Sequence, residues 1–145
     1  MTDTGHDSMN AGIPRGIRNN NPGNLDFVGQ AGAHLETGVP DPRFAAFPTM
    51  GDGIRALRDQ LARYGARGLD TVAAIIGVYA PARENATATY IAALCAQLHV
   101  AADTALDLND PATMRQMICG ITRMENGPGH VGMAQIDRAL DAPPT

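Results

Sequence analysis

Two short segments carry the residue types that could do chemistry in this chain. The first runs from Arg15 to Leu25 and contains three consecutive asparagines followed by Pro-Gly-Asn. Asparagine amides form local turns, proline lacks an N–H and Gly23 tolerates positive φ, so this composition predicts a tight loop. The amides are suited to a neutral polar ligand such as a sugar. The alternative is a well-capped surface turn.

The second segment ends at Glu125, which follows a stretch of helical apolar spacing and directly precedes Asn126 and Gly127. Partial burial and the negative end of the helix dipole both disfavour an ionised carboxylate, so we expect the pKa of Glu125 to be raised. A carboxylic acid that stays protonated near neutral pH could protonate a glycosidic oxygen. The alternative is an exposed glutamate that happens to precede a glycine stop.

Glu84 is a second carboxylate with a distinct expected environment. It precedes Asn85, a predicted helix N-cap, where the incoming helix dipole favours the ionised form and lowers the pKa. Two carboxylates with pKa values pushed apart suit an acid combined with an ionised base or stabiliser. Glu84 is therefore either the partner of Glu125 or a plain capping-box residue.

The elements that must position these groups are mostly helices. Residues 1–12 are polar and without periodicity, which predicts a disordered arm, and residues 13–141 form a single domain. Short apolar pieces, Leu25 to Val28 and Phe44 to Phe47, could pair as a small β-hairpin. From Thr49 onward the apolar spacing becomes helical. The predicted fold class is mainly α (α+β).

The first predicted helix begins at Thr49 or Asp52 and stops within 65–68, where glycines gather. Asp70 is the predicted cap of a second helix, which ends before Pro81. Apolar residues on these two helices define one buried face on each.

A third helix is predicted to start at Asn85 or Thr87. Asp110 followed by Pro111 is a strong helix start, and that fourth helix is expected to end at Asn126. It carries a stripe of methionines from Met114 to Met124, which we interpret as core packing, with a floor for a sugar ring as the alternative. Residues 131–140 predict a short fifth helix.

Composition excludes several classes of function. The 145 residues carry a formal net charge of −4, and the arginines are scattered without any lysine, which argues against a nucleic-acid partner. The histidines lack metal-ligand spacing, so we expect neither metal nor cofactor. Cys95 and Cys119 fit apolar helical patterns as free thiols, with a disulfide between them as an alternative.

The amino-terminal residues lack the apolar core of a signal peptide, and no stretch approaches transmembrane length. We therefore expect synthesis in the cytoplasm without membrane insertion. A substrate outside the cytoplasm would require delivery by another machine.

Together, residues 121–127 and Asn19 to Asn24 resemble the two halves of a lysozyme-like active site, a helix ending in a catalytic glutamate and an Asn-rich hairpin loop facing it. In most lysozyme-like peptidoglycan hydrolases the glutamate helix precedes the hairpin. Here the order is reversed, as in a circularly permuted chain.

The wider sequence resembles a family of phage virion-associated and secretion-effector peptidoglycan hydrolases over roughly residues 13–130. The shared landmarks are the segments Arg15 to Asn24, Phe44 to Phe47, Gly53 to Leu57, Ala80 to Asn85 with Thr87, Tyr90 with Ile91, and Glu125 to Gly127.

This resemblance implies a peptidoglycan-cleaving glycosidase, either a lysozyme (muramidase) or a lytic transglycosylase, that acts on the β-1,4 glycan strand. Glu125 would be the general acid. If Glu84 or Asp26 activates water or stabilises the oxocarbenium ion, the product is hydrolytic. If neither does, attack by the sugar's own 6-hydroxyl gives an anhydro product. Glu36 is expected to be solvated surface.

Asn20, Asn21 and Asn24 would hold N-acetyl and hydroxyl groups, and Arg18 either tethers the loop or is exposed. Tyrosine's polar tip allows either a buried, satisfied hydroxyl or a place in the groove. The expected substrate-binding residues are Arg18, Asn20, Asn21, Asn24, Tyr79, Asn85 and Tyr90.

The alternative function is a non-catalytic virion structural or glycan-binding module that retains the fold. A third possibility is a toxin domain with a delivery apparatus and an immunity partner. The expected partners are bacterial peptidoglycan strands and a virion or secretion-system carrier. The expected site of action is the periplasm or cell wall after delivery.

Overall fold

A computed structural model describes residues 12–79 and 85–141, and Asn85 by its backbone alone. The predicted arm at 1–12 therefore lies outside the described residues apart from Gly12, and so does Glu84. The elements are α1 (Arg15–Arg18), β1 (His34–Leu35), β2 (Ala45–Ala46), α2 (Met50–Ala66), α3 (Val72–Tyr79), α4 (Asn85–Leu98), α5 (Pro111–Asn126) and α6 (Met133–Asp141).

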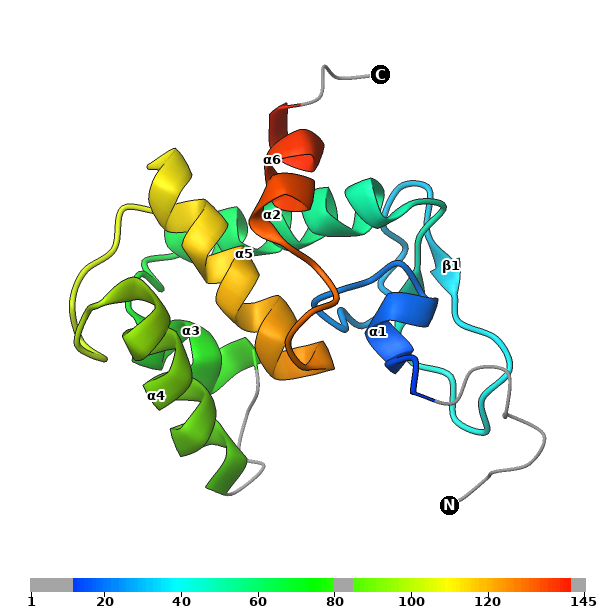
Figure 1. Cartoon of the computed structure of the whole chain (residues 1–145), viewed down its shortest axis with the longest axis horizontal. Coiled ribbons are helices and arrows are strands. Elements are labelled where there is room, and N and C mark those ends of the chain that lie inside the picture. Colours follow the sequence, from blue (N-terminus) through cyan, green and yellow to red (C-terminus); the bar gives the residue numbers. More distant parts are fainter. Residues whose placement is uncertain (1–11, 80–84, 142–145) are drawn as a thin grey trace.

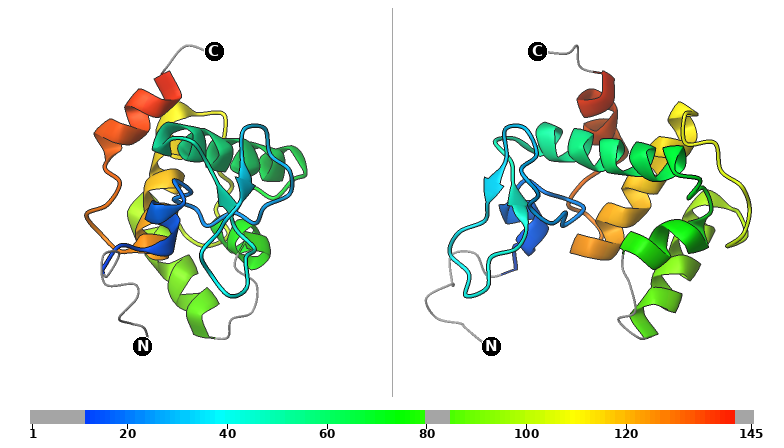
Figure 2. Two further views of the ribbon diagram at one scale, coloured as in Figure 1. Left: turned by 90° about the vertical axis from the view of Figure 1, so that its right-hand side faces the viewer. Right: turned by 180° about the vertical axis from the view of Figure 1, so that it is seen from behind.

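The predicted class, mainly α (α+β), is confirmed, because the described helices far outweigh a single two-stranded antiparallel sheet. Helix α5 is central and contacts α1, α2, α4 and α6. Figure 1 shows α5 crossing the molecule diagonally, with α3 and α4 to one side and α1 and β1 to the other. Seen from behind in Figure 2, α2 spans the distance between these two sides.

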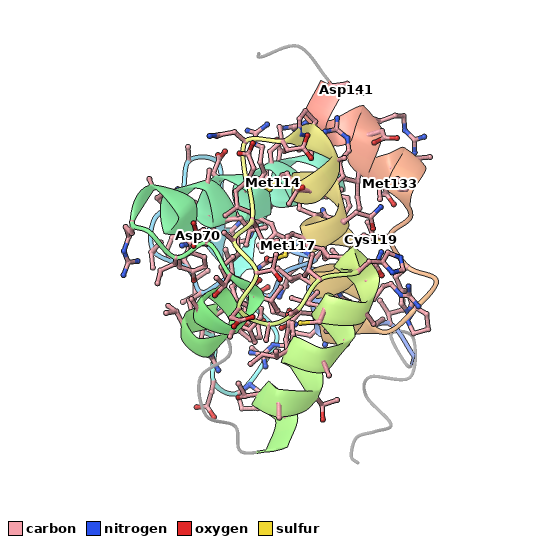
Figure 3. The ribbon with its side chains drawn as sticks, turned by 90° about the vertical axis from the view of Figure 1, so that its left-hand side faces the viewer. Asp70, Met114, Met117, Cys119, Met133 and Asp141 are labelled. Carbon is pink, nitrogen blue, oxygen red and sulfur yellow. The ribbon has the colours of Figure 1, made fainter. Side chains whose placement is uncertain are left out.

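The apolar core lies where α2, α3, α4 and α6 pack around α5. Met114, Met117, Ile118 and Ile121 follow the helical i, i+3, i+4, i+7 spacing and are buried. Figure 3 places Met114 and Met117 along α5 among the neighbouring helices. The predicted role of these methionines in core packing is confirmed, whereas Met124 is only half-buried.

Local caps explain where the helices begin. Thr49 accepts a hydrogen bond from Asp52 N at the start of α2, and Asp110 accepts one from Thr113 N at the start of α5. Asp70 as the cap of α3 was a wrong prediction. Ala74 N donates to Thr71 Oγ1 at 3.1 Å, because Thr71 is the residue that directly precedes the helix.

The hairpin differs from its prediction. β2 falls within the predicted segment 44–47, but it pairs with β1 in the register His34↔Ala46 and Leu35↔Ala45. The predicted partner, residues 25–28, contacts this segment through one bridge, Asp26↔Phe44, and a hydrogen bond from Ala45 N to Leu25 O. β2 is therefore flanked on both sides.

The segment predicted as a loop contains one short helix, α1. Ile17 N and Arg18 N both donate to Pro14 O, and the turn ends as Asn21 N donates to Gly16 O. Among the described residues no helix combines the length and apolar character needed to cross a bilayer. The same residues contain no group of His, Cys, Asp and Glu placed to hold a metal ion.

Candidate functional site

The glutamate at the end of α5 meets the Asn-rich loop directly. Asn24 Nδ2 donates to Glu125 Oε1 at 2.8 Å, although the two residues lie 101 positions apart in sequence. Tyr90 of α4 donates its hydroxyl to Glu125 Oε2, also at 2.8 Å. The prediction that the two segments meet is confirmed. Glu125 is half-buried and both of its carboxylate oxygens accept hydrogen bonds, so the alternative prediction of an exposed glutamate is wrong.

Asparagine at two positions gives the loop its shape. Asn20 and Asn24 have φ of 52° and 51°, in the left-handed region that asparagine tolerates better than most side chains. Asn20 Nδ2 donates to Phe47 O at 3.1 Å, which pins the loop to the segment after β2. Asn20 therefore serves the loop's position and does not line the cavity described below.

Asn21 is the structural centre of the loop. Its side chain is 0% exposed, and Nδ2 donates to Leu25 O at 2.9 Å and to Ala45 O at 2.8 Å. Leu25 N donates back to Asn21 Oδ1 at 2.9 Å. The expectation that Asn21 contacts sugar is wrong, because every polar group of its amide is used inside the fold.

Gly16 allows the loop to approach the end of α5. A Cβ at this position would lie 2.5 Å from Asn126 Oδ1 and 2.8 Å from Asn24 Oδ1. Both oxygens are buried and accept no hydrogen bond from the described residues, so a side chain at position 16 would press directly on two buried amide oxygens. Asn126 Nδ2 donates to Pro22 O at 2.8 Å, which completes the junction.

A cavity of about 410 Å³ opens beside Glu125. Its wall combines the loop and strand region with three helices. Gln60 and Tyr64 come from α2, Val78 and Tyr79 from α3, and Glu125 from α5. The remaining lining residues are Gly23, Asn24, Leu25, Asp26, Val28, Gln30, Arg43 and Phe44.

Asp26 reaches the same cavity as Glu125. Its Oδ1 accepts a hydrogen bond from Arg43 Nε at 3.0 Å, and both side chains are more than half exposed. The guanidinium of Arg43 also lies over the Phe44 ring, 4.8 Å from its centroid. Asp26 is thus an ion-paired carboxylate at the cavity wall.

Glu36 is buried, and its expected place on the solvated surface is wrong. The residue is 2% exposed and accepts hydrogen bonds from Arg15 Nε at 2.9 Å and Asn19 Nδ2 at 3.0 Å. The backbone N–H groups of Arg43 and Phe44 also donate to it. The Arg15 guanidinium, then these backbone donors, hold the pKa of Glu36 well below its ordinary value.

This ion pair tethers the loop, a role that one reading gave to Arg18. The Arg18 side chain is exposed and makes no hydrogen bond to the described residues, so the alternative interpretation, an exposed Arg18, is the one that the structure supports. Sequence reasoning missed Glu36 because its partners lie up to 21 positions away, in segments without any periodic signal.

Tyr79 is half-buried and Tyr90 is buried, and the hydroxyl of each donates a hydrogen bond. Tyr79 donates to the Gly23 carbonyl and also lines the cavity, and its ring meets that of Tyr64 edge-on at 6.5 Å between centroids. Burial raises the pKa of Tyr79. Burial and the nearby Glu125 carboxylate raise the pKa of Tyr90, which holds Glu125 and does not line the cavity.

Asn85 begins α4, as one of the two predicted starts, but its side chain and the whole of Glu84 lie outside the described residues. The roles expected of them remain predictions. Gln60, Tyr64 and Val78 were missed as cavity residues, although the helical spacing of Tyr64 placed it on the inner face of α2.

Comparison with known proteins gives one informative match. The chain is 36% identical to Protein P5 of Pseudoalteromonas phage PM2 over 118 residues, which cover 78% of this chain and 71% of that protein. No family model matches the chain.

Proposed function

The chain belongs to the family of Protein P5 of Pseudoalteromonas phage PM2, and we propose that it is a peptidoglycan-cleaving glycosidase. Its substrate would be the β-1,4 glycan strand, and Glu125 would be the general acid. The enzyme would be a lysozyme-like muramidase or a lytic transglycosylase, with the two halves of its site in circularly permuted order.

One observation carries this proposal. The Glu125 carboxylate lies at the wall of a cavity of about 410 Å³ and is held there by the amide of Asn24. Glycoside cleavage needs a positioned carboxyl that can protonate the leaving oxygen. The cavity is also lined by neutral amides and by two tyrosines, Tyr64 and Tyr79, which are groups that suit a sugar.

The bonds at Glu125 leave room for the proton that such an acid must carry. Asn24 and Tyr90 each donate to a different oxygen, and each carboxyl oxygen has a second lone-pair direction. A proton on that second position can be transferred to a glycosidic oxygen in the cavity. Tyr90 and Asn24 fix the orientation of the carboxyl group.

Asp26 decides between the two product types in this proposal. As a second carboxyl group at the same wall, it could direct a water molecule to the anomeric carbon and give a reducing end. Its pairing with Arg43 reduces its availability for that step, which favours attack by the 6-hydroxyl of the sugar. The two products differ by one water molecule.

The test is digestion of purified sacculi followed by mass spectrometry of the released fragments. We expect soluble muropeptides from the wild type, and a loss of about 100-fold or more in rate for Glu125→Gln. Asp103→Asn, an exposed carboxylate outside the site, is the matched control and should keep the wild-type rate. Full activity of Glu125→Gln would refute the assigned acid.

A second candidate, a non-catalytic glycan-binding or virion structural module, is favoured by one specific observation. Glu125 links the loop and α4 through two hydrogen bonds, so its carboxylate also has a purely structural use. In that case sacculi would carry the protein down in a co-sedimentation assay without losing turbidity.

We also propose that the protein is carried by a virion and acts in the periplasm or cell wall. The support is the phage source of its relative. Detection of the protein in purified particles tests this point.

A further inference from the structure

A second cavity adjoins the one at Glu125. It has a volume of about 380 Å³ and lies against the outer face of α2. Gln30 lines both cavities, so its side chain stands at their boundary. Gln60, which lines the first cavity, accepts a hydrogen bond at 2.9 Å from Arg63, which lines the second.

Arginines dominate this second space, which we call the arginine cavity. Its charged lining residues are Asp52, Arg55, Arg58, Asp59 and Arg63, an excess of one positive charge in a protein of net charge −4. The excess is notable because the remainder of the chain is acidic.

The three guanidinium groups differ in how well they are neutralised. Arg55 pairs with Asp52 at 2.8 Å and also donates to Ala139 O, so both terminal nitrogens of its guanidinium have a partner. Arg58 pairs with Asp59, its neighbour in sequence, through an exposed contact of the kind that contributes little.

Arg63 has no carboxylate partner among the described residues; its bond goes to a neutral amide. Arg58 and Arg63 are therefore the groups that could take an anionic ligand. A guanidinium bound to a carboxylate in two places forms one of the stronger and more directional polar contacts.

We propose that the arginine cavity binds a free carboxylate of the peptides that branch from the peptidoglycan glycan strand. This inference rests on the proposed function, since it needs the strand to lie in the cavity at Glu125. The repeating sugars of the strand are uncharged apart from these substituents, so amides suffice for the strand. The arginine cavity, which only Gln30 separates from the cavity at Glu125, suits the charged peptides that branch from the strand.

Binding to glycan with and without its peptides tests the inference. All proteins carry Glu125→Gln so that strands stay intact, and the comparison is between this parent and the same chain with Arg58→Gln and Arg63→Gln. The two polymers are sacculi and strands stripped of peptides by an amidase, in which the lactyl carboxylates freed by that hydrolysis have been converted to amides so that the strand carries no charge. Arg138→Gln, an exposed arginine on α6, is the matched control for the loss of charge.

We expect the parent to bind peptide-bearing glycan about tenfold more tightly than stripped glycan. The double variant should lose that preference and bind both polymers with the parent's affinity for stripped strands, while Arg138→Gln keeps the preference. A free stem peptide should compete with the parent, whereas the same peptide with amidated carboxyl groups should not.

Equal binding of the parent to both polymers, or an equal loss on both in the double variant, would overturn the inference. Cleavage is scored separately, on chains with Glu125 intact. Peptide-dependent binding without product release would refute the proposed catalysis and support carboxylate binding in the arginine cavity. Product release without peptide-dependent binding would support the proposed catalysis and overturn the inferred role of the arginine cavity.

Discussion

The two parts of the described chain bury different kinds of groups. From Met50 onward the helices bury aliphatic and methionine side chains around α5. Residues 12–48 bury Asn21 and Glu36, and a third buried polar group, Asn126, reaches across from α5 to the Pro22 carbonyl. The loop region also buries apolar side chains such as Leu25 and Phe47, but it adds to them the directional hydrogen bonds of buried polar groups, whereas apolar packing dominates the helical region.

This difference teaches where the site gets its precision. Apolar packing tolerates small adjustments because neighbouring side chains can turn, whereas a buried polar network has few geometries in which all its members are satisfied. The loop that presents Asn24 to Glu125 therefore has a single well-defined shape. We expect its variants to respond more sharply to geometry and pH than variants of the helices.

The largest effect should come from Gly53→Ala, where α2 touches the loop. A Cβ at Gly53 would lie 1.9 Å from Asn20 O, a backbone atom with no freedom to turn. We expect a loss of about 3–4 kcal/mol in the free energy of unfolding, measured by urea denaturation.

Gly120→Ala in the helical region is the matched comparison. Its Cβ would lie 2.3 Å from Leu94 Cδ2, the end of a side chain that can move, so we expect a loss of only about 1–2 kcal/mol. Equal losses at the two glycines would contradict the contrast between rigid loop and adaptable helices.

The next largest effect should be at Glu36. Its folded pKa lies below its ordinary value of 4.5, so the stability it contributes is full above that value and is lost as the pH falls below it. Glu36→Gln should cost about 2–3 kcal/mol at pH 7, because a buried group that accepts hydrogen bonds from four residues is weakened. The cost should shrink toward pH 3.

Urea denaturation of wild type and Glu36→Gln at both pH values measures this linkage. Asp59→Asn removes an exposed ion pair and should cost less than about 1 kcal/mol at either pH. A Glu36→Gln cost that stays constant with pH would argue against the charged network as the support of the loop.

The smallest effect on stability should come from Tyr90→Phe, where the helical region meets the loop region at Glu125. The variant removes one donor to Glu125 and should cost about 1 kcal/mol in stability. Cleavage of sacculi should fall about tenfold with substrate binding unchanged, because the carboxyl loses one of its two fixed contacts.

Tyr64→Phe is the control, since the Tyr64 hydroxyl has no hydrogen-bonded partner in the described part of the chain. It should change the cleavage rate less than about twofold. If Tyr90→Phe cleaved sacculi as fast as the wild type, Asn24 alone would be sufficient to orient Glu125.

Much of the fold could be predicted from the sequence because the signals that mark a helix lie close together along the chain. The capping residues Thr49 and Asp110 lie within three residues of the N–H groups they bind, and apolar spacing marked the buried faces. The error at Asp70 came from choosing between two adjacent capping residues. The strand partner at residues 34–35 was missed because a two-residue strand carries no alternating pattern.

The candidate site was predicted in part. Residue types identified Asn24 and Glu125, but their meeting depends on contacts across the whole chain. The burial of Glu36 and the hydrogen bonds of Asn21 within the fold depend on partners far away in the sequence, which local composition does not predict. Polar residues that build a loop and polar residues that bind a ligand look alike in a sequence.

The span of 101 positions between Asn24 and Glu125 bears on when the site can exist. A nascent chain leaving the ribosome exposes its Asn-rich turn early but gains the carboxylate only near the completion of α5. Fragments released by premature termination before that point would lack the carboxyl group that Asn24 contacts, so the proposed wall-degrading activity could not arise from unfinished translation products.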